Sequence, residues 1–339
     1  MAIAVATILV SMALLPVVWP ATRGTDTAAM SPSLPATLSA GSQLSAPPTS
    51  TGAPTVVPSA PASPSIDPGP VTDLIGAGDV CVTANIADAR KTAALVSARP
   101  TAVVFTLGDN SNETGTAAQY VKCYGSTWGA FLSRTHPAAG NHDVLTSHGR
   151  PYYAYFGSAA GASGLGYYGY DLPADWHVIV LNSNCDEVGG CGAGSPEEVW
   201  LKANLAANSG KHIIAMWHHP EFSSGGHFGS TSYRTWWDDL YAAHADIVLN
   251  GHDHDYERFA QQSSAGEADP KGIREFVVGT GGASHTPLFL IRPNSEVSDG
   301  DTFGVLKLTL KSNSYSWQFI PVDGATFTDS GQTATNSAD

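Results

Sequence analysis

Five apolar stretches of this sequence each end in side chains that bind metals or move protons. They are "IGAGD" at 75–79, "FTLGD" at 105–109, "AAGNHD" at 138–143, "IIAMWHH" at 213–219 and "IVLNGHDH" at 247–254. One such stretch alone is usually a turn or a cap. Five in succession indicate buried strands whose carboxyl ends meet at one ligand-binding edge of an α/β fold. The ligand-capable residues at these ends are Asp79, Asp109, Asn141, His142, His218, His219, His252 and His254.

Carboxylate, amide and imidazole groups make up this set, and no group of thiolates accompanies them. Such donors suit Fe, Zn, Mn or a similar metal ion. The set exceeds what one tetrahedral ion needs, so we expect two ions about 3.5–4 Å apart, bridged by one carboxylate. A glycine stands directly before each of Asp79, Asp109, Asn141 and His252, and we expect these glycines to permit the tight turns that aim the side chains.

The remaining pattern alternates strands with helices and ends in a hairpin. We predict helices over 86–98, 195–208 and 232–244, with partial helix over 116–132, and strands over 71–78, 101–108, 167–172, 176–183, 212–217, 245–250, 274–279, 303–310 and 314–322. The helix over 195–208 has Ser195 as N-cap, Pro196 in the first turn and Glu198 in position to close a capping box. This order predicts an α/β domain with mixed sheets.

The N-terminal quarter has a different composition. Residues 2–19 are almost wholly apolar, which predicts a signal peptide or an N-terminal membrane anchor over 1–22, although the first basic residue is Arg23. Residues 23–70 are rich in Pro, Ser, Thr and Ala and predict a disordered linker. The folded domain is therefore expected over 71–339.

Charge restricts the partners of the chain. Asp and Glu number 30 against 16 Lys and Arg, a net charge of −14. This balance excludes a general electrostatic attraction to nucleic acid or to an anionic membrane. We therefore predict no nucleic-acid partner, and contact with a membrane only through the N-terminal segment.

Four cysteines suggest two disulfides in an exported protein. Cys185 and Cys191 lie in one short Gly-rich loop, which leaves Cys81 to pair with Cys123. The alternative is a zinc site made of all four thiolates, but their spacing does not form the paired knuckles of such sites.

The series GD–GD–GNHD–HHP–GHDH resembles the calcineurin-like metallophosphoesterase family. "GHDHDYER" and the later "GTGG" are similar to its purple acid phosphatase branch, of the secreted bacterial type. The resemblance covers most of residues 73–325. It implies a four-layer αββα sandwich of two mixed β-sheets flanked by helices, and it makes 71–339 the catalytic domain.

The resemblance also implies a ligand set. One ion would be held by Asp79 and His254, Asp109 would bridge both ions, and the second ion would be held by Asn141, His218 and His252. His218 takes the ligand role because it stands two residues before Pro220. His219 is then expected to be a neighbouring or surface residue.

Two further histidines are expected to act in catalysis. His142 follows the asparagine ligand and would contact the phosphate or protonate the leaving group. His227 resembles a further family histidine; its alternative is a loop histidine without a role. The implied reaction is in-line attack by metal-bound hydroxide, with no protein nucleophile. A serine hydrolase is set aside because no G-x-S-x-G motif is present.

Two positions depart from the family pattern. Purple acid phosphatases carry a tyrosine three residues after the bridging aspartate, and its phenolate binds ferric iron and gives the colour; here that residue is Asn112. We predict that this protein is not purple, that Asn112 supplies an amide oxygen or leaves its place to water, and that the metal is Fe, Zn or Mn. Cys81 stands where many relatives have a ligand histidine, and we favour its disulfide over metal binding.

The combined expectation is an exported, dinuclear-metal phosphomonoesterase of acid phosphatase type, secreted or held in the cell envelope. The alternatives are a phosphodiesterase acting on nucleotides or lipid head groups, and a non-catalytic surface protein that binds phosphate. The aromatic residues near the HHP and His227 segments either line a leaving-group pocket or pack in the core; they are Trp217, Phe222, Phe228 and Tyr233.

Overall fold

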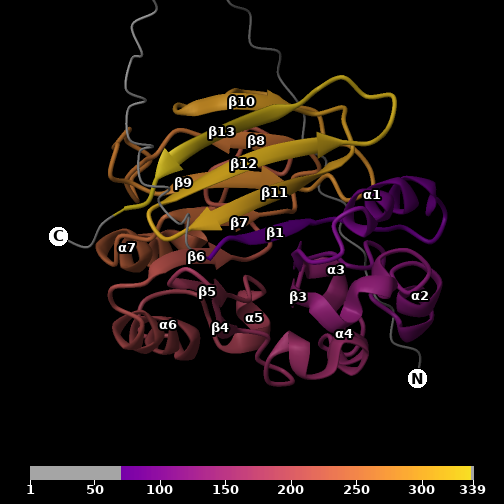
Figure 1. Cartoon of the computed structure of the whole chain (residues 1–339). Helices are drawn as coiled ribbons and strands as arrows, with labels where there is room; N and C mark the ends of the chain where they lie inside the picture. Colours follow the sequence, from indigo (N-terminus) through magenta and orange to yellow (C-terminus); the bar gives the residue numbers. More distant parts are fainter. Residues whose placement is uncertain (1–69, 337–339) are drawn as a thin grey trace, which may run out of the picture. The chain divides into compact units, whose positions relative to one another are not determined.

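The computed structural model describes residues 70–336, which form two mixed β-sheets with helices on their outer sides (Figure 1). This is the α/β arrangement of four αββα layers that the sequence predicts. The predicted signal peptide or anchor at 1–22, and the linker but for its last residue, lie outside the described residues. Within 70–336, no helix is both long and apolar enough to cross a membrane.

The first sheet has the strand order β13-β12-β11-β1-β2-β3. Its parallel strands are β1 (Thr72–Ala77), β2 (Val103–Leu107) and β3 (Thr135–Ala138). Its antiparallel part is formed by β11 (Gly304–Lys311), β12 (Ser314–Pro321) and β13 (Asp329–Ala334). The hairpin predicted near the C-terminus is the pair β11 and β12.

The second sheet has the order β10-β8-β9-β7-β6-β5-β4. Its parallel strands are β5 (Trp176–Val180), β6 (His212–Met216), β7 (Ile247–Asn250) and β9 (Arg274–Val278). Its antiparallel strands are β4 (Tyr168–Leu172), β8 (Tyr256–Phe259) and β10 (Ser295–Asp299).

Alternate residues of the second sheet enter two separate apolar clusters. Val178, Ile214 and Leu249 join the cluster that also contains Leu74 and Phe105 of the first sheet. Their sequence neighbours turn to the opposite face, since side chains alternate along a strand. There they pack with residues of α6 and α7 in a second cluster that includes Ile179, Ile213, Val248, Leu201 and Trp236. One core therefore lies between the sheets, and another lies between a sheet and its helices.

The helices are short. They are α1 (Ala87–Ser97), α2 (Ala117–Lys122), α3 (Asn141–Val144), α4 (Arg150–Phe156), α5 (Cys185–Val188), α6 (Pro196–Ala207) and α7 (Arg234–Ala242), with 3-10 turns η1 (Trp128–Arg134), η2 (Gly157–Ala160) and η3 (Thr231–Tyr233). In Figure 1, α6 and α7 lie together on the side of the second sheet, away from α1 and α2.

The N-terminus of α6 corrects one detail of the sequence prediction. The Ser195 hydroxyl accepts the Glu198 N–H at 3.3 Å, as expected of an N-cap. The Glu198 carboxylate, however, accepts the N–H of Gly194 at 3.1 Å. The box is therefore closed one residue earlier than predicted, because the preceding turn presents Gly194 to this side chain.

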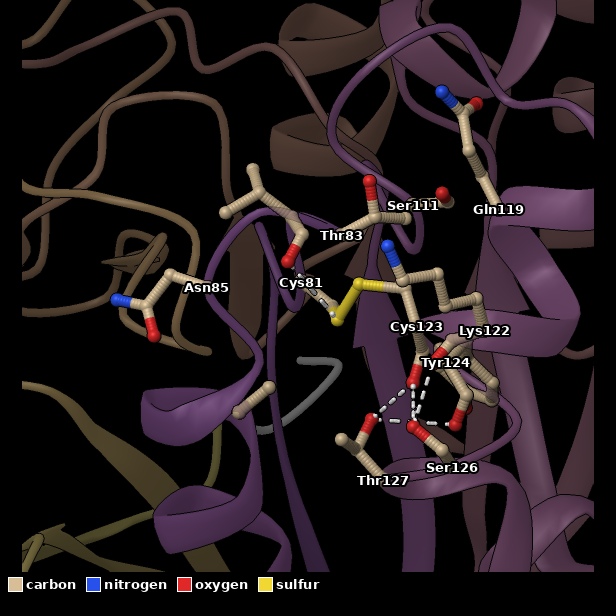
Figure 2. The surroundings of a disulfide bond; sticks show 12 residues. Cys81, Thr83, Asn85, Ser111, Gln119, Lys122, Cys123, Tyr124, Ser126 and Thr127 are labelled. Atoms are coloured by element: carbon tan, nitrogen blue, oxygen red, sulfur yellow. Dashed lines mark hydrogen bonds between the residues drawn. A yellow bond between two sulfur atoms is a disulfide. The ribbon is translucent and has the colours of Figure 1, made fainter.

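Two disulfides join Cys81 to Cys123 and Cys185 to Cys191, and the described residues contain no free cysteine. Figure 2 shows the first, which ties the segment after β1 to the end of α2. The Cys123 carbonyl accepts hydrogen bonds from the hydroxyls of Ser126 and Thr127. The backbone at Cys123, to which Cys81 is joined, is therefore fixed.

Candidate metal centre

The predicted ligands follow the ends of strands from both sheets. Asp79, Asp109 and Asn141 come after the parallel strands β1, β2 and β3 of the first sheet. His218 follows β6, and His252 and His254 follow β7, in the second sheet. Parallel strands deliver their carboxyl ends to one edge, which is why residues so far apart in sequence meet here.

Asp109 lies at the centre of the group. Ligand-capable atoms of Asp79, Asp109 and His218 all lie within 4.8 Å of one another, and all three residues are buried. Asp109 Oδ2 is 3.4 Å from His218 Nε2, while Asp109 Oδ1 accepts the His142 N–H at 2.8 Å. One carboxylate oxygen therefore remains directed at the neighbouring ligands.

His218 is fixed in one orientation. Its Nδ1–H donates to the Leu107 carbonyl at 2.7 Å, so Nε2 is the nitrogen free to bind a metal. That Nε2 lies 3.0 Å from Asn141 Oδ1. The structure thus brings Asn141 and His218 together on one side of Asp109.

His254 and Asp79 meet on the other side. His254 Nε2 lies 3.1 Å from Asp79 Oδ1, and His254 Nδ1 is 2.6 Å from the Ser284 hydroxyl. The backbone N–H of His254 donates to Thr286 Oγ1 at 3.1 Å. Sequence reasoning missed Ser284 and Thr286, since they carry no motif and act only by holding a ligand.

His252 lies between the two sides. Its backbone N–H donates to Asp79 Oδ2 at 2.8 Å, and its ring centroid is 5.0 Å from that of His218 and 4.6 Å from that of His227. Ligand nitrogens of His218, His219 and His252 lie within 4.8 Å of one another. His219, which the sequence left as a neighbour, is therefore close enough to the centre to contact a bound ion or its ligand.

Asn112 sits among three of the predicted metal ligands. Its amide Nδ2 is 3.2 Å from Asp79 Oδ1, 3.2 Å from Asp109 Oδ2 and 3.3 Å from His254 Nε2. Three atoms that could bind a metal therefore surround one point, and the Asn112 amide occupies that point. A half-turn of that amide would present its oxygen instead, which is the atom a cation requires.

Both predicted catalytic histidines lie at the edge of this group of ligand-capable residues. His142 Nδ1–H donates to the Glu113 carbonyl at 2.5 Å, and its Nε2 is 3.8 Å from Asp109 Oδ2. His227 Nδ1–H donates to the His252 carbonyl at 2.9 Å. In each ring Nε2 is left to exchange a proton, and the two side chains are 34% and 46% exposed.

Three of the predicted ligands have a backbone in the left-handed region, with positive φ. The φ angles are 55° at Asp79, 49° at Asp109 and 72° at His252. Asp and His tolerate this conformation better than most side chains, at some cost in strain. The preceding glycines therefore do not all act through turns, as the sequence suggested. Gly140 is needed for close approach, since a Cβ there would lie 2.1 Å from Asp109 Oδ1.

The histidines of this group differ in the direction in which their surroundings shift the pKa. Burial disfavours charge on His218, but the nearby Asp109 carboxylate outweighs burial and raises the pKa of His218 to about 9. Burial lowers the pKa of His219 to about 3, and burial with four neighbouring imidazoles brings that of His252 far below its usual range. His219 and His252 are accordingly neutral, the form in which imidazole binds metal.

These residues fit a pair of metal ions. The donors are oxygen and nitrogen, they converge on either side of Asp109, and the orienting bonds to His218 and His254 are those that metal ligands require. No other group of three such residues with converging ligand atoms occurs in 70–336.

A surface pocket of about 360 Å³ adjoins the centre on the side of Asn141 and His219. Its walls include the carboxylates Asp186 and Glu187, and no lysine or arginine lines it. Of the four aromatic residues considered above, Trp217 and Tyr233 are buried, and Phe222 packs against Trp237. Trp217 and Phe222 therefore serve mainly as core packing, Tyr233 is buried but also lines this pocket, and Phe228 is exposed.

Comparison with known proteins gives a consistent family. Residues 74–256, more than half of the chain, match the family model described as calcineurin-like phosphoesterase. Purple acid phosphatase 18 of Arabidopsis thaliana is 32% identical over 122 residues, 34% of this chain and 26% of that protein. The chain thus matches about a quarter of the length of this relative.

Two solved structures share the fold. A purple acid phosphatase from yellow lupin (Lupinus luteus) seeds superposes with a TM-score of 0.61 at 19% identity, covering 78% of this chain and 54% of that one. The inner-membrane-complex anchor protein of Plasmodium gives a TM-score of 0.61 at 14% identity, covering 79% of this chain and 90% of its own. The match of the family model over most of the ligand-bearing strands carries the assignment: the chain belongs to the calcineurin-like phosphoesterase family.

Proposed function

We propose that this protein is an exported phosphomonoesterase that works with two metal ions. Asp79, His254 and Asn112 would hold one ion, and Asn141, His218 and His252 the other. Asp109 carries the proposal, because its Oδ2 lies within 3.4 Å of His218 and 3.2 Å of the amide that also meets Asp79 and His254. A carboxylate between two ligand sets is what a two-metal site needs.

The fold alone does not decide activity, since the Plasmodium anchor protein shares it. Support for catalysis comes from His142 and His227. Bound metals would neutralise phosphoryl oxygens and lower the pKa of a water molecule. The protein's own part is to place two imidazoles beside the cluster, each held through Nδ1 so that Nε2 can exchange a proton. Either can give a proton to the departing alkoxide.

Monoester preference and export have separate support. The relatives matched in sequence are purple acid phosphatases, which favours monoesters. The acidic wall at Asp186 and Glu187 disfavours substrates with further anionic groups beside the reacting phosphate. Two disulfides favour an oxidising compartment outside the cytoplasm, in agreement with the apolar residues 2–19. Cell fractionation and sequencing of the mature N-terminus test export.

The first experiment compares an aryl phosphate monoester with its diester, using the full chain loaded in turn with Fe, Zn and Mn. We expect a strong preference for the monoester in at least one metal form. Preference for the diester would replace the proposal with phosphodiesterase activity. Failure to hydrolyse either, with two metals bound, would favour a phosphate-binding protein.

A second experiment tests the bridge. Asp109→Asn should lower metal content below two ions per chain and reduce turnover to less than about a tenth of wild type. Asp186→Asn removes the same charge from the pocket wall and is the matched control, with metal content unchanged. Full metal content in the Asp109 variant would contradict the bridging role.

A further inference from the structure

An exposed apolar group lies at the edge of the candidate centre, opposite in character to the acidic pocket. Phe289, Leu290 and Ile291 are consecutive and are 66%, 76% and 53% exposed, and Phe228 is 54% exposed. We call these four residues the apolar rim. Exposed apolar side chains are common singly, but a contiguous group marks a binding surface.

The rim is an ordered part of the fold. The rings of Phe228 and Phe289 have centroids 6.1 Å apart, and the Phe289 N–H donates to the Ser224 carbonyl at 3.1 Å. Arg292 continues the attachment, because its Nε donates to the Ser223 carbonyl at 3.0 Å. Hydrogen bonds thus fix the backbone of the segment that carries these exposed side chains.

Two connections join the rim to the centre. The segment that ends in the rim also holds His254, through Ser284 at 2.6 Å and Thr286 at 3.1 Å. Phe228 directly follows His227, whose ring centroid is 4.6 Å from that of His252. The rim is therefore continuous with the groups that would bind the phosphate.

Phe228 is held in a costly conformation. Its φ is 62°, in the left-handed region that an aromatic residue rarely adopts. Strain of this kind persists where the surrounding structure enforces it and often belongs to a binding site. Here the conformation accompanies an exposed ring beside a candidate catalytic histidine.

We propose that the apolar rim binds the alcohol part of the substrate, so that the preferred substrates are phosphate monoesters of alcohols with aliphatic or aromatic groups. The inference rests on the proposed function and specifies its substrate class. The two sides of the centre then differ in chemistry. The side of Asp186 and Glu187 repels anionic groups, and the side of Phe228 and Phe289 removes apolar groups from water.

A chain-length series tests the proposal. Methyl, butyl and hexyl phosphates are compared as substrates of the full, metal-loaded chain. Each methylene that the rim removes from water contributes up to about 0.8 kcal/mol, or roughly fourfold, so we expect kcat/KM to rise about two- to fourfold per methylene. Methyl- and hexylphosphonate, which cannot be hydrolysed, are compared in parallel by calorimetric binding.

Variants separate the rim from general surface effects. Leu290→Ser with Phe289→Ser should flatten the chain-length dependence in both the kinetic and the binding series. Val121→Ser and Val199→Ser alter exposed valines on α2 and α6, 69% and 57% exposed, and should leave the slope as in wild type.

The outcomes distinguish this inference from the proposed function. Hydrolysis of methyl phosphate with no chain-length dependence would overturn the rim and leave the phosphatase intact. Tighter binding of hexylphosphonate without hydrolysis would support the rim and overturn the phosphatase. Cosedimentation with phosphatidylcholine vesicles that is lost in the rim variant, together with a flat series, would overturn the proposal in favour of membrane docking.

Discussion

Three of the proposed ligands at the centre have a second contact that directs the binding atom. His218 is held by the Leu107 carbonyl, His254 by the Ser284 hydroxyl, and Asp109 by the backbone of His142. Such outer contacts fix ring orientation and tautomer. His142 and His227 are held the same way but remain partly exposed, which suits proton transfer more than metal binding.

Replacing His142 separates catalysis from metal binding. In His142→Ala the imidazole is lost, while the backbone N–H that donates to Asp109 remains. We expect turnover to fall roughly 10²–10⁴-fold with metal content unchanged. Metal analysis beside steady-state kinetics measures both quantities. Loss of metal would show that His142 is needed for the ligand set and not for proton transfer.

Asn112 is the residue on which the expected colour of an iron-loaded form depends. Its amide lies within 3.3 Å of three ligand atoms, so no phenolate occupies that point. We expect the iron-loaded wild type to lack a strong visible charge-transfer band and Asn112→Tyr to gain one. Asn112→Phe is the control, because it has a ring of similar size without the oxygen. A band in the wild type would mean that another group supplies the charge transfer.

At the scale of elements, the disulfides support two loops beside the centre. The Cys81–Cys123 bond anchors the segment that follows Asp79, and the Cys81 carbonyl accepts the Asn112 N–H at 2.8 Å. The Cys185–Cys191 bond closes the loop that carries Asp186 and Glu187. The first disulfide therefore supports the segments that carry Asp79 and Asn112, and the second supports the loop that forms the pocket wall.

The two disulfides are expected to differ in their effect on stability. They close loops with sequence separations of 42 and 6 residues. Loop-closure entropy predicts losses of about 4 kcal/mol for Cys81→Ala with Cys123→Ala, and about 2 kcal/mol for Cys185→Ala with Cys191→Ala. Denaturant unfolding of both pairs measures the difference. Equal losses, or a reversed order, would show that local packing outweighs chain entropy.

At the scale of the whole molecule, stability should depend on Glu197 of α6. Its Oε1 accepts the Asn182 N–H at 2.6 Å, while its Oε2 is buried without a hydrogen-bond partner among the described residues. Burial raises the pKa of Glu197 to about 8. The folded state thus holds a proton that the unfolded state loses near pH 4–5, and the stability from this group falls as pH rises through 8.

Glu197→Gln should weaken that pH dependence. Between pH 6 and 9 we expect the melting temperature of the wild type to fall at least about 3 °C further than that of the variant. Comparing the two proteins cancels effects of metal loss that both share. Glu267→Gln, at an exposed site, is the charge-matched control. Parallel curves for wild type and Glu197→Gln would contradict the role of this carboxyl group.

The parts of the fold that the sequence predicted are those with strong apolar strands. Strands β8, β10 and β13 were missed because they are short or polar, and of β3 only its end, at the stretch 138–143, was expected. In β8, Arg258 is buried and bonds to Asp329 of β13, so charged residues there look like a loop in the sequence. The structure brings most of the motif residues close together, since each motif follows the end of a strand.

Long-range packing is harder to infer. Phe289 and Leu290 are apolar, and residue type alone would place them in the core, but they are exposed. The position of His219 beside His252 also depended on how two strands meet. Neither could be read from residue types, because both follow from the arrangement of segments distant in the chain.

The division of the proposed ligands between two sheets has a mechanical consequence. Asp79, Asp109 and Asn141 belong to one sheet, and His218 and His252 belong to the other. The apolar layer between the sheets includes Leu74 and Leu249. It separates the strand ends of the two sheets that carry these two groups of ligands. Each proposed ion takes ligands from both sheets, so we expect a substitution in this apolar layer to change the distances between the ligands of one ion before it unfolds the protein.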